Sequence, residues 1–133
     1  MVGIVKVDTL QNNAGTSSVD MDYVVNGSAK AWVNINGSSG TPTARDSLNV
    51  SSITDNNTGR YAPVLTSAMG DTNYSLCGVT NANTGDTFGA PADLVMGINN
   101  VVTTTTTTFE MTNYSSSYVD SKYCFGHVFG DLA

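Results

Sequence analysis

The apolar and polar positions along the chain follow the pattern of short strands separated by turns. Short runs of β-branched and aromatic residues alternate with clusters of Gly, Asn, Asp and Ser at intervals of about ten residues. No window of about ten residues carries apolar side chains at the i, i+3, i+4, i+7 spacing of an amphipathic helix. The pattern predicts an all-β fold, specifically a single antiparallel β-sandwich, jelly-roll-like or Greek key, with an extended N-terminal arm.

Turn signals divide the chain into the expected strands. Asn26-Gly27 is a tight-turn pair, and residues 55–59 join the two arms of the clearest hairpin. Strands are expected at 2–10, 19–25, 29–35, 48–54, 60–66, 73–80, 94–102, 103–111 and 122–129, with 94–111 forming either one long strand or a hairpin. We expect residues 1–15 to form the N-terminal strand or arm and residues 16–133 to form the sandwich domain.

Three positions predict finer features of these strands. The spacing of Val50 and Ile53 sends side chains of a regular strand to opposite faces, so a bulge near Ser51-Ser52 is expected to bring them to one face. Pro63 cannot donate to a sheet hydrogen bond, which predicts an edge or bulged position for its strand. The last strand is apolar on both faces, which predicts a central, buried strand with His127 as a core or interface residue.

Charge is scarce, and the surface has to be built mainly from neutral polar side chains. Charged residues make up 12% of the 133-residue chain, whereas Thr, Ser and Asn together number 46. The net charge is -6 and only five residues are basic. A surface that binds nucleic acid or anionic lipid needs a dense basic patch. We therefore expect neither nucleic acid nor a membrane as a partner.

The N-terminal stretch and the cysteines bear on the compartment. Asp8 interrupts the apolar stretch that begins at Val2, and no small-residue cleavage site follows, so no signal peptide is expected. No run approaches the roughly 20 apolar residues that span a bilayer. The chain is expected to be made in a cytosol and to stay soluble, with Cys77 and Cys124 as two buried thiols. A disulfide formed after release is the alternative.

Residues that could carry catalysis or bind a metal are few and scattered. His127 is the only histidine and Glu110 the only glutamate, and the chain has no nucleophile elbow of the form Gly-x-Ser-x-Gly. Asp20 and Asp22 are expected on one face of a strand, as solvated acids rather than calcium ligands. We expect no enzymatic activity, no metal and no cofactor.

The threonine run and the aromatic residues have structural and binding interpretations. The threonines at 103–108 are expected to form an exposed strand with a threonine face. Trp32 is expected in the core, and a sugar-stacking platform is the alternative. Tyr114 and Tyr118 lie in a polar loop, which makes them the better candidates for a surface recognition loop.

Segments along most of the chain resemble structural proteins of tailed bacteriophages. They are 6–12, 27–37 (GSAKAWVNING), 45–56 (RDSLNVSSITDN), 58–61, 68–74 and 124–131 (CFGHVFGD). Similar segments occur in tail-fibre proteins, especially those of marine and cyanobacterial phages. The chain departs from the resemblance at 62–65, where such proteins carry an unbroken alternating strand, and no function is carried onto 103–121.

The resemblance implies a virion structural protein without a catalytic motif. A chain without a shaft or attachment module is expected to be a head decoration (cement) protein on the capsid exterior, where it stabilises neighbouring capsid subunits. The alternative is a short tail-fibre or fibre-tip domain that recognises a host-surface glycan. The residues expected to contact the major capsid protein or other virion proteins, by adding a strand, are Val2, Ile4, Val5, Val7 and Leu10. By analogy with proteins at three-fold positions, a homotrimer is expected.

Overall fold

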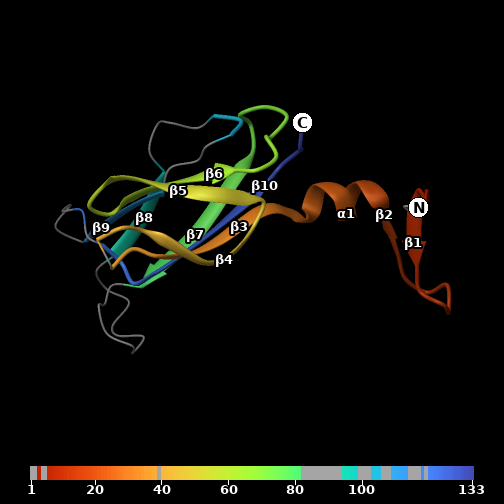
Figure 1. The fold of residues 1–133 in the computed structure, drawn as a ribbon. Helices are drawn as coiled ribbons and strands as arrows, with labels where there is room; N and C mark the ends of the chain where they lie inside the picture. The colour runs from red at the N-terminus through yellow and green to blue at the C-terminus, as the bar shows by residue number, and fades with distance from the viewer. Residues whose placement is uncertain are drawn as a thin grey trace.

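The chain forms two four-stranded antiparallel sheets and an N-terminal element that extends away from them (Figure 1). The computed structural model describes residues 3, 6–38, 40–81, 94–98, 103–105, 109–113, 118 and 120–133. Side chains are described in these ranges except at 81, 94–98 and 109–113. Strands dominate the described ranges, which contain a single helix of 7 residues.

The first sheet is centred on the last strand of the chain. Its strands are β3 (Ala29–Asn36), β4 (Thr43–Leu48), β7 (Ser75–Asn81) and β10 (Tyr123–Phe129), in the order β4-β3-β10-β7. β10 pairs antiparallel with β3 and with β7, so the predicted central position is confirmed. Cys124 and Val128 are buried, whereas His127 is exposed. The core alternative for His127 is wrong, because strand alternation places residue 127 on the face opposite to Cys124 and Val128. The interface alternative stays a prediction.

The second sheet is built around a hairpin. Its strands are β5 (Val50–Asn57), β6 (Arg60–Leu65), β8 (Leu94–Ile98) and β9 (Phe109–Asn113), in the order β5-β6-β9-β8. β8 and β9 are antiparallel neighbours, as in the hairpin alternative. Residues 103–105 lie outside the strands, so the predicted threonine strand is wrong there, and residues 106–108 lie outside the described ranges. The backbone carbonyls of Thr104 and Thr105 instead accept hydrogen bonds from Met69 and Leu65.

One of the two finer predictions for the second sheet is confirmed, and the other is wrong: β6, which carries Pro63, lies between β5 and β9 and is not an edge strand. The β5–β6 register shifts between Val50 and Ser52, and Val50 and Ile53 both pack against the core. Pro63 lies opposite Ile53, while the described residues of β9 pair with β6 only at Arg60 and Tyr61. The missing N–H of Pro63 therefore removes no described β6–β9 pair.

The inner faces of the two sheets share a core of two clusters. The first joins Val33, Ile35 and Cys124 of the first sheet to Tyr61 of the second. The second cluster consists of Ala31, Val128, Leu65 and Met69. The prediction of an all-β fold with antiparallel sheets is confirmed, and its finer form, a single sandwich of jelly-roll or Greek-key type, stays a prediction.

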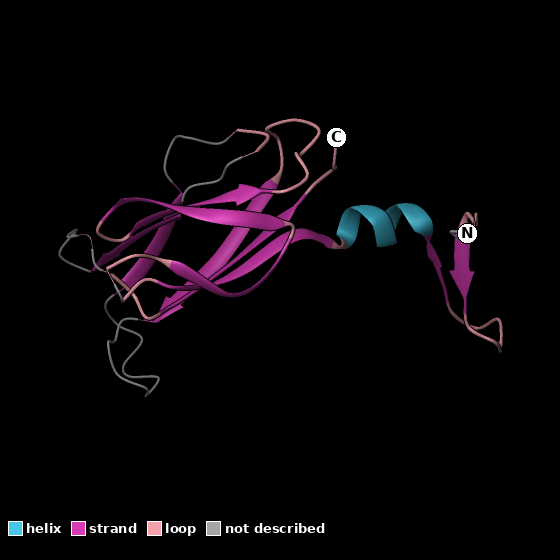
Figure 2. Cartoon of the chain, in the orientation of Figure 1, coloured by secondary structure: helices cyan, strands magenta, loops and turns pink. Residues whose placement is uncertain are grey.

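Residues 19–25, predicted as a strand, are mostly helical. β1 (Thr9–Gln11) and β2 (Ser18–Asp20) form a hairpin, and α1 (Met21–Gly27) follows it directly (Figure 2). Asp20 accepts a hydrogen bond from the backbone N–H of Asp22 at 2.9 Å and caps the start of α1. Lys30 Nζ donates to the carbonyls of Val25 and Ser28, at the negative end of the helix. These end contacts favour a helix over the strand preference of Val24-Val25.

Candidate functional site

The N-terminal segment, defined as residues 6–28, leaves its apolar side chains uncovered. All of its residues are exposed except Met21, which is partly buried. Tyr23 is 76% exposed and Val25 is 51% exposed. The other large exposed hydrophobic residues of the segment are Val7, Leu10, Val19 and Val24. Exposed apolar side chains concentrated on one element are typical of a surface that binds a partner.

This segment is ordered by local hydrogen bonds, because its exposed side chains form no core. Asn12 Oδ1 accepts from the backbone N–H groups of Thr16 and Ser17 at 2.9 and 3.2 Å. Gly15 has a left-handed φ of 69°, as the turn requires. The N–H of Met21 donates to the carbonyl of Asp8 at 2.8 Å. An isolated two-stranded hairpin and a helix of two turns are marginal in water, so burial against a partner would stabilise this element.

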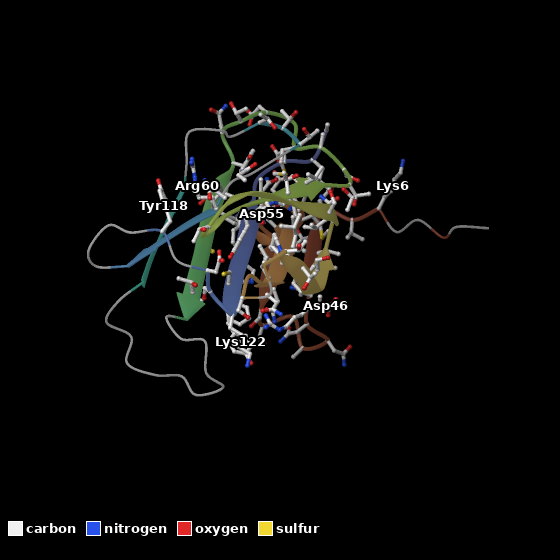
Figure 3. The ribbon with its side chains drawn as sticks, turned by 60° about the vertical axis from the view of Figure 1, so that its left-hand side comes forward. Lys6, Asp46, Asp55, Arg60, Tyr118 and Lys122 are labelled. Atoms are coloured by element: carbon white, nitrogen blue, oxygen red, sulfur yellow. The ribbon has the colours of Figure 1, made fainter. Side chains whose placement is uncertain are left out.

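The structure describes some of the predicted contact and recognition residues. Val7 and Leu10 are exposed on the N-terminal segment, whereas Val2, Ile4 and Val5 lie outside the described residues. Tyr114 also lies outside them. Tyr118 is 45% exposed, and the guanidinium of Arg60 lies 5.3 Å from its ring centre (Figure 3).

The sequence pattern does not reveal the contribution of α1 to this surface. The pattern predicts a strand at Tyr23, Val24 and Val25, where alternation would put Val24 on the opposite face from the other two. In such a strand Asp20 would be one of two solvated acids on one face. The position of Asp20 directly before Met21 is a helix-start signal that could have revealed the helix.

A second apolar surface covers the side of the first sheet that faces away from the second sheet. Across the four strands, Leu48, Trp32, His127 and Cys77 lie directly opposite one another in register. In the next such row, Phe125 lies between Asn34 and Val79. We name the outer face by its residues Trp32, Leu48, Cys77, Val79, Tyr123, Phe125, His127 and Phe129.

Aromatic side chains follow the central strand of the outer face. The rings of Tyr123 and Phe125 are nearly parallel at 6.4 Å between centres, and those of His127 and Phe129 lie 6.5 Å apart. Arg45 lies 4.4 Å from the Tyr123 ring centre, and Lys122 Nζ lies 5.7 Å from it. This end of the outer face is therefore both aromatic and cationic.

Two predictions about the outer face are wrong. Trp32 is only partly buried there instead of lying in the core, because it alternates with the buried Ala31 and Val33. Both cysteines are free, but only Cys124 is buried, and Cys77 is exposed. Cys77 lies opposite His127 and so shares its outward orientation.

Tyr61 and Asp120 line a polar hollow beside the β5–β6 turn. The Tyr61 hydroxyl lies 2.8 Å from Asp120 Oδ1 and 3.2 Å from the carbonyl oxygen of Gly37. The N–H of Gly59 donates to the same carboxylate oxygen at 2.8 Å. Asp120 thus fastens the chain before β10 to the hairpin turn. Within the described ranges, no three His, Cys, Asp or Glu side chains gather closely enough to hold a metal ion.

The buried Tyr61 predicts a loss of stability at high pH. Burial, and then the neighbouring Asp120 carboxylate, raise the pKa of Tyr61 far above its ordinary value of 10.0. Above about pH 10 the unfolded chain releases this phenol proton and the folded chain keeps it. The free energy of unfolding therefore falls as pH rises, by about 1.4 kcal/mol per pH unit from this group. Urea unfolding between about pH 9 and pH 11 measures the slope. Tyr61→Phe should have a shallower slope than the wild type, and equal slopes would contradict the assignment.

Comparison with known proteins adds no assignment. The chain matches no protein-family model, and neither a curated protein nor a solved structure matches it. Among the described residues, no helix has the length and hydropathy needed to span a bilayer.

Proposed function

We propose that this protein is a structural component of a bacteriophage virion, held to neighbouring subunits by its N-terminal segment. The observation that carries the proposal is the set of uncovered apolar side chains on that segment, headed by Tyr23 and Val25. The resemblance to phage structural proteins indicates that the assembly is a virion. Burial of these side chains against a neighbour removes apolar surface from water, which favours attachment without requiring charge.

A head decoration protein on the capsid exterior is the form of this role that we favour. Such a protein binds neighbouring capsid subunits only where they meet in the assembled shell. Binding that exists only in the assembled state stabilises that state by mass action. The surface of the chain, rich in Thr, Ser and Asn and poor in charge, suits dense packing on a particle because repulsion between copies stays small.

A short tail-fibre or fibre-tip domain is the second candidate. The observation that favours it is the exposed Tyr118 ring with the Arg60 guanidinium beside it. An aromatic ring offers an apolar face and a guanidinium offers hydrogen-bond donors, and together they suit a host-surface glycan.

Copy number separates the two candidates. A decoration protein is expected at tens to hundreds of copies per particle, and a fibre at about six to eighteen. Quantitative gel densitometry of purified virions, with the major capsid protein as the internal standard, measures this number. A copy number matching a single tail contradicts the decoration role. So do virions that lack the protein, keep their heat resistance and lose adsorption.

Attachment through the N-terminal segment predicts a loss of occupancy when its apolar surface is removed. Leu10 and Val19 lie opposite each other in the β1–β2 hairpin and are both exposed. Leu10→Ser/Val19→Ser should reduce the affinity for particles by about tenfold, since two exposed apolar side chains lose their burial at the interface. Particle binding by sedimentation measures the change. Leu132→Ser, which alters an exposed residue outside the segment, is the control and should bind as the wild type does.

A further inference from the structure

We propose that the N-terminal segment of one copy docks on the outer face of a second copy of this chain. The proposal rests on the docking role of the segment argued above and names its partner: the neighbouring subunit that the segment contacts is a second copy of this chain. The contact is head-to-tail, since the two copies contribute different surfaces.

Most of the exposed large hydrophobic residues belong to these two surfaces. Among the described residues, the N-terminal segment contributes Val7, Leu10, Val19, Tyr23, Val24 and Val25, and the outer face contributes Leu48 and Val79. Of the large hydrophobic residues that the structure describes as exposed, only Tyr118 and Leu132 lie elsewhere. The partly buried Trp32 and Phe125 extend the apolar area between Leu48 and Val79. Each surface thus offers apolar area that could cover the other.

The path of the chain keeps a segment from covering its own outer face. α1 ends at Gly27, and β3 begins at Ala29, with Ser28 as the only residue between them. Lys30 of β3 donates to the carbonyls of Val25 and Ser28, which ties the end of the helix to the strand. Figure 1 shows that α1 and the β1–β2 hairpin point away from both sheets. The face that receives the segment therefore belongs to another copy.

The charges of the two surfaces are complementary. The N-terminal segment carries Lys6 and three aspartates, Asp8, Asp20 and Asp22. At one end of the outer face, the cationic groups of Arg45 and Lys122 lie over the ring of Tyr123. One carboxylate, that of Asp46, lies in the neighbouring row, where Asp46 is opposite Asn34 in register. Figure 3 shows Lys6 to one side of the sheets, with Asp46 and Lys122 lower in the same view. An acidic segment is thus attracted to a basic end, which orients a contact that apolar burial stabilises.

A head-to-tail contact has a structural consequence. When such a contact closes on itself it forms a ring, or a pair of copies that exchange segments. Both arrangements bury every segment and every outer face. The closed form accounts for exposed apolar surfaces in a chain that otherwise presents neutral polar residues.

Two double variants separate the roles of the surfaces. Tyr23→Ser/Val25→Ser removes apolar area from the segment, and Leu48→Ser/Val79→Ser removes it from the outer face. All four side chains are exposed, from 49% at Leu48 to 76% at Tyr23, so the folds should persist, and circular dichroism checks this. Leu132→Ser is the matched control on an exposed residue outside both surfaces.

Light scattering coupled to size-exclusion chromatography measures assembly of the full chain. The wild type and Leu132→Ser should form oligomers, and each double variant alone should weaken association by about 30-fold. An equimolar mixture of the two double variants should form heterodimers, because one copy supplies an intact segment and the other an intact outer face. Capture of the untagged variant by a tagged one provides a second readout.

The exposed Cys77 thiol gives a probe without further mutation. It lies on the outer face, whereas Cys124 is buried. Its labelling by a maleimide should slow in proportion to the assembled fraction, and the Tyr23→Ser/Val25→Ser variant should label at the monomer rate.

Three outcomes overturn the proposal: a wild type that stays monomeric up to about 100 μM, a segment variant that assembles as the wild type does, and a mixture that forms no heterodimer. The second would indicate outer faces packed on each other. These results are independent of the virion role. A chain that assembles but is absent from virions refutes only that role, and a chain abundant on virions but monomeric refutes only the docking between copies.

Discussion

Replacing Gly37 with alanine is expected to lower the free energy of unfolding by about 3 kcal/mol. A Cβ at this position would lie 2.1 Å from the Tyr61 hydroxyl oxygen and 2.4 Å from Cζ of the same ring. Neither side can yield easily. The N–H of Gly37 donates to the Ser121 carbonyl at 2.8 Å, and the Tyr61 side chain is 1% exposed within the core. Movement of the ring would also break its contact with Asp120.

Chemical denaturation of the Gly37→Ala variant measures the loss. Gly27→Ala is the matched control, because its added Cβ meets no atom within 4 Å, and its effect should stay within about 0.5 kcal/mol. Gly37 is not among the positive-φ glycines, so the expected loss is steric in origin. A Gly37→Ala variant as stable as Gly27→Ala would show that the loop and the ring are not held together.

Replacing Ile35 with alanine should also cost about 3 kcal/mol of unfolding free energy. Ile35 is 1% exposed and packs with Val33, Cys124 and Tyr61. Because Tyr61 belongs to the second sheet, truncation at Ile35 leaves a cavity where the two sheets meet. The cost combines the lost burial of the side chain with the weaker packing of the atoms that line this cavity.

A graded series tests this location. Ile35→Val removes one methyl group and should cost about 1 kcal/mol. Val79→Ala, on the outer face at 62% exposure, should change stability by no more than about 0.5 kcal/mol when the chain is monomeric. If Ile35→Ala and Val79→Ala have equal effects, the sheets do not share the core that the structure shows.

Features that depend on neighbouring residues could be predicted from the sequence. The β5–β6 hairpin follows from the turn residues at 55–59, and the bulge between Val50 and Ser52 follows from the spacing of Val50 and Ile53. The central position of β10 follows from its two apolar faces. Each of these depends on side-chain alternation or turn chemistry within one or two strands.

The candidate site is less accessible to sequence reasoning. Val7 and Leu10 are predicted contact residues and lie exposed, but a strand prediction hides Tyr23 and Val25. The pair Val24-Val25 favours a strand locally, whereas the Asp20 cap and the Lys30 contacts favour the helix. The Lys30 contacts join the start of β3 to the end of α1. The spacing of apolar residues along the sequence cannot reveal such contacts.

The amino-acid sequence alone specifies the β class, the positions of most turns and which residues of each strand alternate. Which of the two alternating faces meets the second sheet is settled only by the three-dimensional fold. In β10, Cys124 and Val128 meet it, and His127 is left on the outer face with Trp32 and Cys77. The physical reason is that both faces of β10 are apolar, so local pattern cannot choose between them. The choice depends on residues far along the chain, such as Tyr61 and Leu65, which are buried against Cys124 and Val128 on one face of β10.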